Sequence, residues 1–316
     1  IPIWGTYITT PEVSQKEAKV AIEIKTSEPN SAIAVETRIV DSKGKEVARS
    51  KEFEVVENKY YQQLTISNPS LWSPESPALY YAETTLKVGG KAVDCYRTRF
   101  GVRTIEISPE KGFALNGESR KIKGVCNHHD LGALGAAVNV SALRRQLTML
   151  KDMGCDAIRT AHNMPAPELV QLCDEMGFMM MIEPFDEWNI AKCKNGYHRF
   201  FDEWAERDMV NMLHNYRNAP SVVMWSIGNE VPNQCADAGW EEAIFLQDIC
   251  HREDPTRLVT CGMDQVRCIA DNGFGAIIDI PGFNYRVHLY EYAYERLPQG
   301  FVLGSETSST ISSRGV

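Results

Sequence analysis

The segment Ser221-Val-Val-Met-Trp-Ser-Ile-Gly-Asn-Glu230 has the composition of a buried strand that ends in polar residues. Its first half is apolar and rich in β-branched side chains, which is typical of parallel strands covered on both faces. In parallel α/β folds the carboxyl ends of strands carry the chemistry, so its position makes Glu230 a candidate catalytic acid. A lone Glu at a strand end is more often a helix cap or an ion-pair partner, and a second carboxylate is needed to favour catalysis.

A second carboxylate occurs near the C-terminus. Gly300-Phe-Val-Leu-Gly-Ser305 is another short apolar strand, and Glu306 follows it directly. Retaining glycoside hydrolysis needs two carboxyl groups, one to protonate the leaving oxygen and one to attack the anomeric carbon. The pair Glu230 and Glu306 therefore predicts this chemistry.

Two motifs, Trp225–Glu230 and Gly304–Thr307, resemble the acid/base and nucleophile motifs of glycoside hydrolase family 2, which contains β-galactosidases, β-glucuronidases and β-mannosidases. Five further segments resemble family signatures in the family's order: Leu71–Tyr80, Phe100–Glu106, Leu115–Gly117, Lys123–Val125 and Ile158–Asn163. Because these matches extend over almost the whole chain, the resemblance is specific.

Length and composition predict a soluble protein of two domains or one large one. The chain has 316 residues, of which 43% are hydrophobic and 24% charged, and its net charge is −9. No apolar run is as long as a membrane span, and the negative charge disfavours nucleic acid or an anionic membrane as a partner. A carbohydrate substrate fits this balance, and the composition is also compatible with a homo-oligomer.

The nine cysteines are scattered, without a CxxC pair. Small buried thiols are common in protein cores, so we expect free thiols rather than a zinc site or a disulfide framework. This usage fits a cytoplasmic protein, and also a periplasmic or secreted one whose signal peptide was removed. The chain starts at Ile1 without a leader, so any targeting segment is expected to be absent from this sequence.

Residues 1–105 are expected to form an all-β, immunoglobulin-like sandwich. Alternating runs such as Val20–Ile24 and Tyr80–Val88 predict about seven strands, and Ser42–Gly44 and Gly89-Gly90 predict turns between strands. The family resemblance implies the same module at this place. Trp72, which has prolines nearby in sequence, is expected to pack at a domain junction rather than to bind sugar.

Residues 106–316 are expected to form an α/β, TIM-type (β/α)8 catalytic barrel. Apolar strands alternate with helical segments such as Ser141–Met153, with Ser141 as N-cap, and Trp240–Glu253. Seven strands can be counted, so the barrel is expected to stop before its eighth strand and the chain to be a fragment of low activity.

Polar residues follow nearly every predicted barrel strand, as a sugar site at the barrel mouth requires. The resemblance implies Glu306 as nucleophile and Glu230 as acid/base. It also implies that Arg159 and His162 orient the nucleophile and contact the sugar, and that Asn229 bonds the sugar 2-hydroxyl. The full set of expected substrate-binding residues is His129, Asp130, Arg159, His162, Asn163, Trp188, Asn229 and Tyr285.

Several of these residues have a second interpretation. Arg159 is equally consistent with a structural ion pair, and Trp188 with core packing beside Phe185. His128 and His129 are adjacent, but neighbouring side chains rarely converge on one ion, so neither a metal nor another cofactor is expected.

The predicted function is a retaining exo-β-glycosidase that acts on terminal β-D-galactosides in carbohydrate metabolism. β-Glucuronidase and β-mannosidase are the alternatives within the family. A non-catalytic carbohydrate-binding or assembly module is the alternative of another class, and the presence of both glutamates argues against it. A barrel glycosidase without accessory domains is disfavoured by the sandwich.

Overall fold

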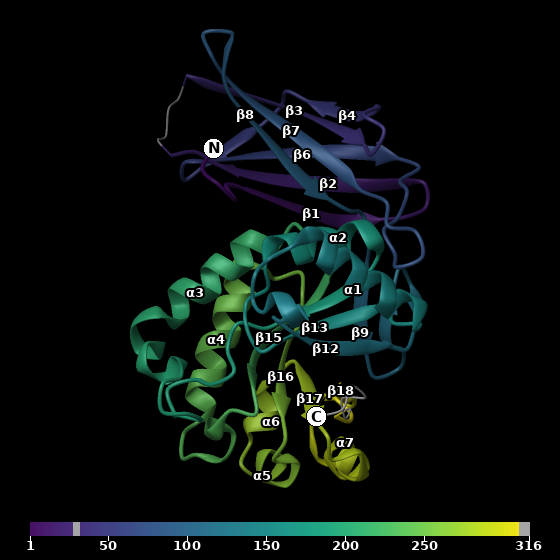
Figure 1. Ribbon diagram of the computed structural model, residues 1–316. Coiled ribbons are helices and arrows are strands. Elements are labelled where there is room, and N and C mark those ends of the chain that lie inside the picture. The colour runs from purple at the N-terminus through teal and green to yellow at the C-terminus, as the bar shows by residue number, and fades with distance from the viewer. Residues whose placement is uncertain (28–31, 310–316) are drawn as a thin grey trace.

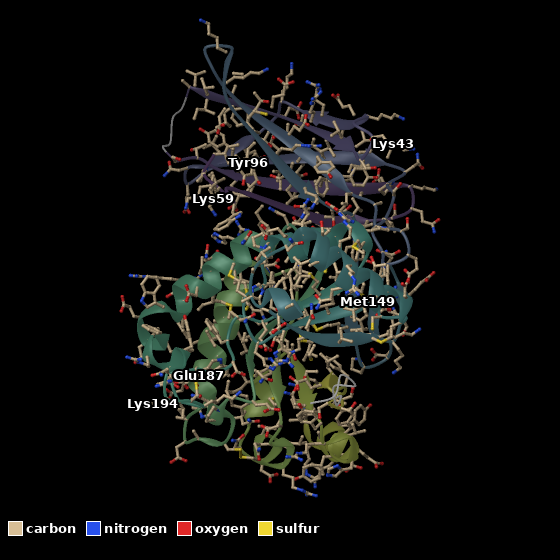
Figure 2. All side chains as sticks on the ribbon, viewed as in Figure 1. Lys43, Lys59, Tyr96, Met149, Glu187 and Lys194 are labelled. Carbon is tan, nitrogen blue, oxygen red and sulfur yellow. A yellow bond between two sulfur atoms is a disulfide. The ribbon has the colours of Figure 1, made fainter. Side chains whose placement is uncertain are left out.

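The computed structural model describes residues 1–27 and 32–309. A β-sandwich, drawn at the top of Figure 1, packs on a barrel of parallel strands and helices below it. Figure 2 adds the side chains, with Tyr96 labelled on the sandwich and Met149 and Glu187 on the barrel. Within the described ranges no helix is both long and apolar enough to cross a bilayer.

The sandwich consists of two four-stranded antiparallel sheets, with strand orders β1-β2-β6-β5 and β4-β3-β7-β8. Its strands are β1 Thr6–Val13, β2 Glu17–Lys25, β3 Ile33–Asp41, β4 Glu46–Ser50, β5 Glu54–Val56, β6 Lys59–Ser67, β7 Tyr80–Val88 and β8 Lys91–Phe100. Buried and more exposed residues alternate along β2 and β7, so each sheet turns one face to a shared core. The fold class is confirmed, and the described residues of the sandwich contain eight strands where about seven were expected.

A small antiparallel sheet and one tryptophan connect the sandwich to the barrel. The sheet contains β9 Ile105–Ser108, β10 Gly112–Leu115 and β11 Glu118–Ser119. Trp72 is fully buried and donates its Nε1 hydrogen to the backbone oxygen of Asp174 in the barrel, at 3.0 Å. Its predicted role as a junction residue is therefore confirmed.

The barrel sheet contains seven parallel strands in sequence order. They are β12 Gly124–His128, β13 Ala157–Ala161, β14 Met179–Ile182, β15 Val222–Asn229, β16 Val259–Met263, β17 Ile280–Asn284 and β18 Leu303–Glu306. β12 and β18 are the edges of this sheet, and Cys126 Sγ on β12 lies 3.5 Å from the Ser305 oxygen on β18. The described strands therefore form a nearly closed barrel, as the count of seven predicted.

Helices follow the strands and cover the outside of the sheet (Figure 1). The α-helices are α1 Val140–Asp152, α2 Pro167–Met176, α3 Phe201–Tyr216, α4 Trp240–Glu253, α5 Val266–Asp271, α6 Phe274–Ile277 and α7 Tyr290–Arg296; the 3-10 helices are η1 Gly132–Leu134, η2 Tyr197–Arg199, η3 Pro232–Cys235 and η4 Val287–Leu289. The N-cap predicted at Ser141 is wrong, because the Asn139 side chain accepts the hydrogen bond from the Ala142 N–H, at 2.9 Å. An Asn before the first turn fills this role as well as a Ser does.

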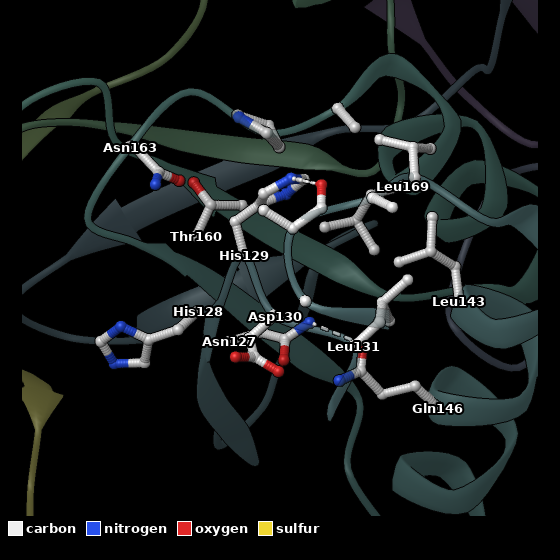
Figure 3. Close-up of a pocket in the computed structure, with 16 residues that line it drawn as sticks. Asn127, His128, His129, Asp130, Leu131, Leu143, Gln146, Thr160, Asn163 and Leu169 are labelled. Carbon is white, nitrogen blue, oxygen red and sulfur yellow. Dashed lines mark hydrogen bonds between the residues drawn. The ribbon is translucent and has the colours of Figure 1, made fainter. Parts of the chain in front are cut away.

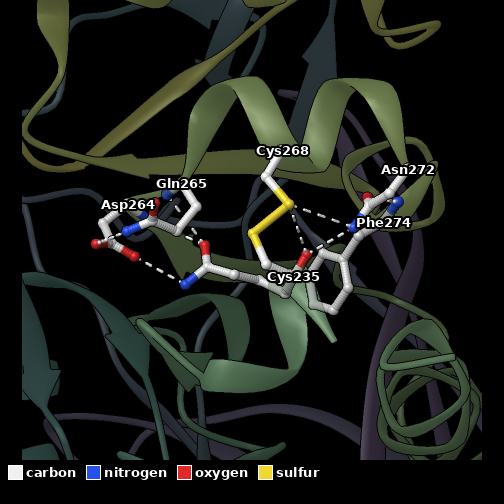
Figure 4. The surroundings of a disulfide bond; sticks show 7 residues. Cys235, Asp264, Gln265, Cys268, Asn272 and Phe274 are labelled. Atoms are coloured by element: carbon white, nitrogen blue, oxygen red, sulfur yellow. Dashed lines mark hydrogen bonds between the residues drawn. A yellow bond between two sulfur atoms is a disulfide. The ribbon is translucent and has the colours of Figure 1, made fainter. Parts of the chain in front are cut away.

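The prediction of free thiols is wrong for two of the nine cysteines. Cys235 and Cys268 form a disulfide, with their Cα atoms 6.0 Å apart (Figure 4). It joins η3, in the loop after β15, to α5, in the loop after β16. No local pattern predicts this bond, since 33 residues separate the two cysteines and only the packing of neighbouring βα loops brings them together.

Candidate active site

Glu306 ends β18, and both of its carboxylate oxygens have hydrogen-bond donors. Arg159 Nη1 donates to Oε1 at 2.6 Å, and Tyr285 Oη donates to Oε2 at 2.7 Å. His162 Nε2 lies 3.3 Å from Oε1. These partners hold the Glu306 carboxylate in a fixed orientation. The Glu306 side chain is 13% exposed, so it remains accessible to solvent.

Arg159, on β13, is the centre of this network. Its Nη2 donates to Glu183 Oε2 at 2.7 Å and to Asn229 Oδ1 at 3.0 Å. Burial disfavours the charged guanidinium, but the charges of Glu183 and Glu306 outweigh burial and raise the pKa of Arg159 above its usual range. A Cβ at position 262 would lie 2.5 Å from Nη2, so Gly262 leaves the room that this side chain needs.

Glu230 directly follows β15 and has a left-handed backbone, with φ of 44°. Its N–H donates to the Gly262 oxygen at 2.7 Å, and its Oε1 accepts from Asn284 Nδ2 at 3.0 Å. Such a backbone is uncommon for a residue other than glycine and is often found at functional sites. The turn ends the strand and places the carboxyl beside the end of β17.

Tyr285 connects the two glutamates electrostatically. The hydrogen bond to Glu306, burial, and the negative charges of Glu306 and Glu230 together raise the pKa of Tyr285 to about 12. Its hydroxyl therefore remains a donor at any working pH. A chain of hydrogen bonds also runs from Glu230 through Asn284, Asn229 and Arg159 to Glu306, so the two glutamates lie on one network.

Asn229 connects the surroundings of Glu230 to the loop after β14. Its Oδ1 accepts from Arg159 and from Asn284 Nδ2, the latter at 2.8 Å, and its Nδ2 donates to Asp186 Oδ1 at 2.9 Å. Lys192 Nζ donates to the same Asp186 oxygen at 2.8 Å and to the Asn229 backbone oxygen at 3.1 Å. Burial would raise the pKa of Asp186, but the bonds from Lys192 and Asn229 lower it below its usual value.

Three expected binding residues lie at a neighbouring hollow rather than in this network. His129, Asp130 and Asn163 line a small pocket beside the start of α1 (Figure 3). His129 Nε2 is hydrogen-bonded to the Ala136 oxygen at 2.9 Å, and Asp130 accepts from the Gly132 N–H. Within the part of the chain that is described, none of the three bonds to Glu230 or Glu306.

Trp188 lies in the core and not in the wall of the site. Its side chain is fully buried, its Nε1 donates to the Ile227 oxygen at 2.7 Å, and its ring stacks on Phe274 with centroids 6.1 Å apart. A Cβ at Gly228 would lie 2.8 Å from Nε1, so the indole packs directly against β15. Of the two interpretations of this residue, the structure therefore supports core packing.

Four residues of the network were not among the expected site residues: Glu183, Asp186, Lys192 and Asn284. A signal was present, because Glu183 directly follows the apolar strand β14 as Glu230 and Glu306 follow or end theirs. Asn284 ends β17 as Asn229 ends β15. Within residues 1–27 and 32–309, no group of three or more His, Cys, Asp or Glu side chains is placed to hold a metal ion.

A barrel with two glutamates at the ends of its strands has the arrangement of a glycoside-cleaving enzyme. Residues 105–297 match the family model "Glycosyl hydrolases family 2, TIM barrel domain", and residues 3–103 match "Glycosyl hydrolases family 2". The chain therefore belongs to glycosyl hydrolase family 2.

Similar proteins of this family are named for different activities. Over 99% of its length the chain is 37% identical to beta-galactosidase BoGH2A from Bacteroides ovatus, and it spans 41% of that protein. It is also 37% identical to a putative beta-glucuronidase from Formosa agariphila, over 81% of this chain and 24% of that protein. A crystal structure of a family 2 member from Bacteroides cellulosilyticus superposes with a TM-score of 0.91 at 35% identity, over 96% of this chain and 40% of that one.

Proposed function

We propose that this site hydrolyses terminal β-D-galactosides with retention of configuration, by double displacement. The observation that carries the proposal is the environment of Glu306, whose two oxygens are held by Arg159 and Tyr285. The fixed carboxylate attacks the anomeric carbon, while Glu230 donates a proton to the departing oxygen. Glu230 then removes a proton from water, which attacks the glycosyl-enzyme and releases the sugar.

The choice of a galactoside is supported by the relative from Bacteroides ovatus, which is named a beta-galactosidase and is similar over almost this entire chain. A β-glucuronide is the second candidate, since the Formosa agariphila relative at the same identity is named a putative beta-glucuronidase. The chain covers 41% and 24% of these proteins, so contacts from elsewhere in the complete protein bear on the choice between the two sugars.

The test uses the complete protein in which this sequence occurs. We expect hydrolysis of 4-nitrophenyl β-galactoside in preference to the β-glucuronide and β-mannoside, and release of the β-anomer first in a proton NMR time course. Glu306→Gln is expected to abolish turnover without changing the melting temperature by more than a few degrees. First release of the α-anomer, or activity in the Glu306→Gln variant, would contradict the mechanism.

A further inference from the structure

Glu183 is a buried carboxylate that the double displacement does not use. It follows β14 directly, and its side chain is fully inaccessible to solvent. It therefore cannot touch the substrate. An ionised carboxylate without solvent is costly unless donors surround it, so its partners indicate why it is there.

Both oxygens of Glu183 accept hydrogen bonds from groups that face the site. Oε2 accepts from Arg159 Nη2 at 2.7 Å, from Arg159 Nε at 3.2 Å, and from the Ser226 hydroxyl. Oε1 lies 2.7 Å from His162 Nδ1. Burial would raise the pKa of Glu183, but the charge of Arg159 and the hydrogen bond from His162 outweigh burial and lower it.

The same two side chains that hold Glu183 also reach Glu306. Arg159 Nη1 and His162 Nε2 lie 2.6 Å and 3.3 Å from the same oxygen, Glu306 Oε1. Arg159 and His162 thus each connect Glu183 to Glu306. Each of the two side chains contacts Glu306 with one nitrogen and Glu183 with another. The planar guanidinium gives this connection a fixed geometry, because its donors cannot move independently.

We propose that Glu183 is a positioning residue for Glu306, acting through Arg159 and His162. The inference rests on the proposed function, in which Glu306 is the nucleophile. Arg159 divides its charge between the two carboxylates, so without the charge of Glu183 it pairs with Glu306 alone and makes that carboxylate a weaker nucleophile. His162 also loses the acceptor that fixes its ring. Both effects slow the attack on the anomeric carbon, and the substitution removes no side chain that contacts the sugar, because Glu183 itself is buried.

A purely structural role predicts a different result, and the chain offers a matched comparison. Asp254 and Arg257 form an ion pair in which the acid is 0% and the arginine 4% exposed, as in the pair of Glu183 and Arg159. Asp254 bonds to Trp225 Nε1 and to Tyr7 of the sandwich, and not to Glu230 or Glu306 in the described structure. Removing either acid takes a carboxylate partner from a buried arginine, but only Glu183 is connected to the nucleophile.

The experiment compares Glu183→Gln with Asp254→Asn in the complete protein. Each is treated with 2,4-dinitrophenyl 2-deoxy-2-fluoro-β-galactoside, which traps the glycosyl-enzyme, and covalent labelling is followed by intact-protein mass spectrometry. Peptide mapping of the wild-type protein first identifies the labelled residue. We expect Glu183→Gln to lower the labelling rate constant about 100-fold, the typical cost of a small misplacement of a reacting group. The reagent concentration for half-maximal rate should change by less than about threefold, because contacts with the sugar remain.

Asp254→Asn should lower the melting temperature and leave the labelling rate constant within about twofold of the wild type, as expected for a site with no shared partner. The inference is overturned if Glu183→Gln labels at the wild-type rate, or slows by the same factor as Asp254→Asn.

If Glu183→Gln does not fold, Glu183→Asp replaces it, since this variant keeps the charge and shortens the side chain by one methylene. Wild-type labelling by Glu183→Asp overturns the inference as well. If the reagent labels wild-type protein at a residue other than Glu306, the proposed function fails, and the inference with it.

Discussion

The hydroxyl of Tyr285 is the simplest single group on which to test the site. Its hydrogen bond to Glu306 Oε2 measures 2.7 Å, and the rise of its pKa to about 12 keeps the donor hydrogen in place. A hydrogen bond to a charged group contributes about 1.5–3 kcal/mol, so Tyr285→Phe is expected to lower kcat roughly 10- to 100-fold. The measurement is kcat and KM on the preferred 4-nitrophenyl glycoside between pH 5 and pH 9.

The control is Tyr216→Phe. Tyr216 is also a tyrosine with a bonded hydroxyl, which donates to the Pro165 oxygen at 2.6 Å, and it is 2% exposed. Its loss should lower thermal stability and leave kcat unchanged. Equal effects of the two substitutions on kcat would argue against a special role for Tyr285.

At the scale of elements, Glu187 organises the loop between β14 and α3. Its carboxylate accepts from the backbone N–H groups of Lys192, Cys193 and His198 and from the His198 ring. Burial would raise the pKa of Glu187, but these bonds lower it to about 2 from its ordinary value of 4.5. Gly196 is needed in this loop, because a Cβ there would lie 1.7 Å from Glu187 Oε1.

This carboxylate predicts a contribution to stability that depends on pH. Because the folded-state pKa is depressed, the contribution is complete above about pH 5 and is lost as the pH falls toward 2. Glu187→Gln should therefore be less stable than the wild type at pH 7, and the difference should shrink below pH 4.5. Urea unfolding at a series of pH values measures it. The exposed Glu295→Gln serves as control, and a difference for Glu187→Gln that is constant with pH would contradict the argument.

At the scale of the whole molecule, the sandwich and the barrel are joined by directed hydrogen bonds. Asn218, in the loop between α3 and β15, accepts from the Ile8 N–H at 2.8 Å and donates to the Thr6 oxygen at 2.9 Å. Arg103 Nε donates to the Pro220 oxygen at 2.6 Å. Bonds from both sides of the junction should make the two parts unfold together.

We therefore expect a single calorimetric transition, and we expect Asn218→Ala to lower the free energy of unfolding by about 1–3 kcal/mol, since two backbone groups of β1 lose their partner. Asn215→Ala is the matched control. Asn215 lies three residues earlier and makes no hydrogen bond to the sandwich in the described structure. Two separate transitions in the wild-type protein would show that the junction does not couple the two parts.

The sequence by itself determined the order of the elements and the two central carboxylates. Alternation with period two predicted the sandwich, and apolar strands followed by helical segments predicted the barrel, because each pattern reflects which faces of a local element are buried. Glu230 and Glu306 could be found because each stands where an apolar strand ends, and strand ends of a parallel barrel meet at one rim.

Only the tertiary structure decided which strand-end side chains face one another. The pairing register shifts on β15 between Ser226 and Asn229 and on β17 between Phe283 and Asn284. Such a shift changes the direction of the side chains that follow it. Asn229 and Asn284 bond to each other at these strand ends, whereas the Trp188 side chain is buried in the core. The contact between Arg159 and Glu306 spans 147 residues, and the disulfide spans 33. Such pairings depend on how distant strands and loops align in space, which no local pattern of residues encodes.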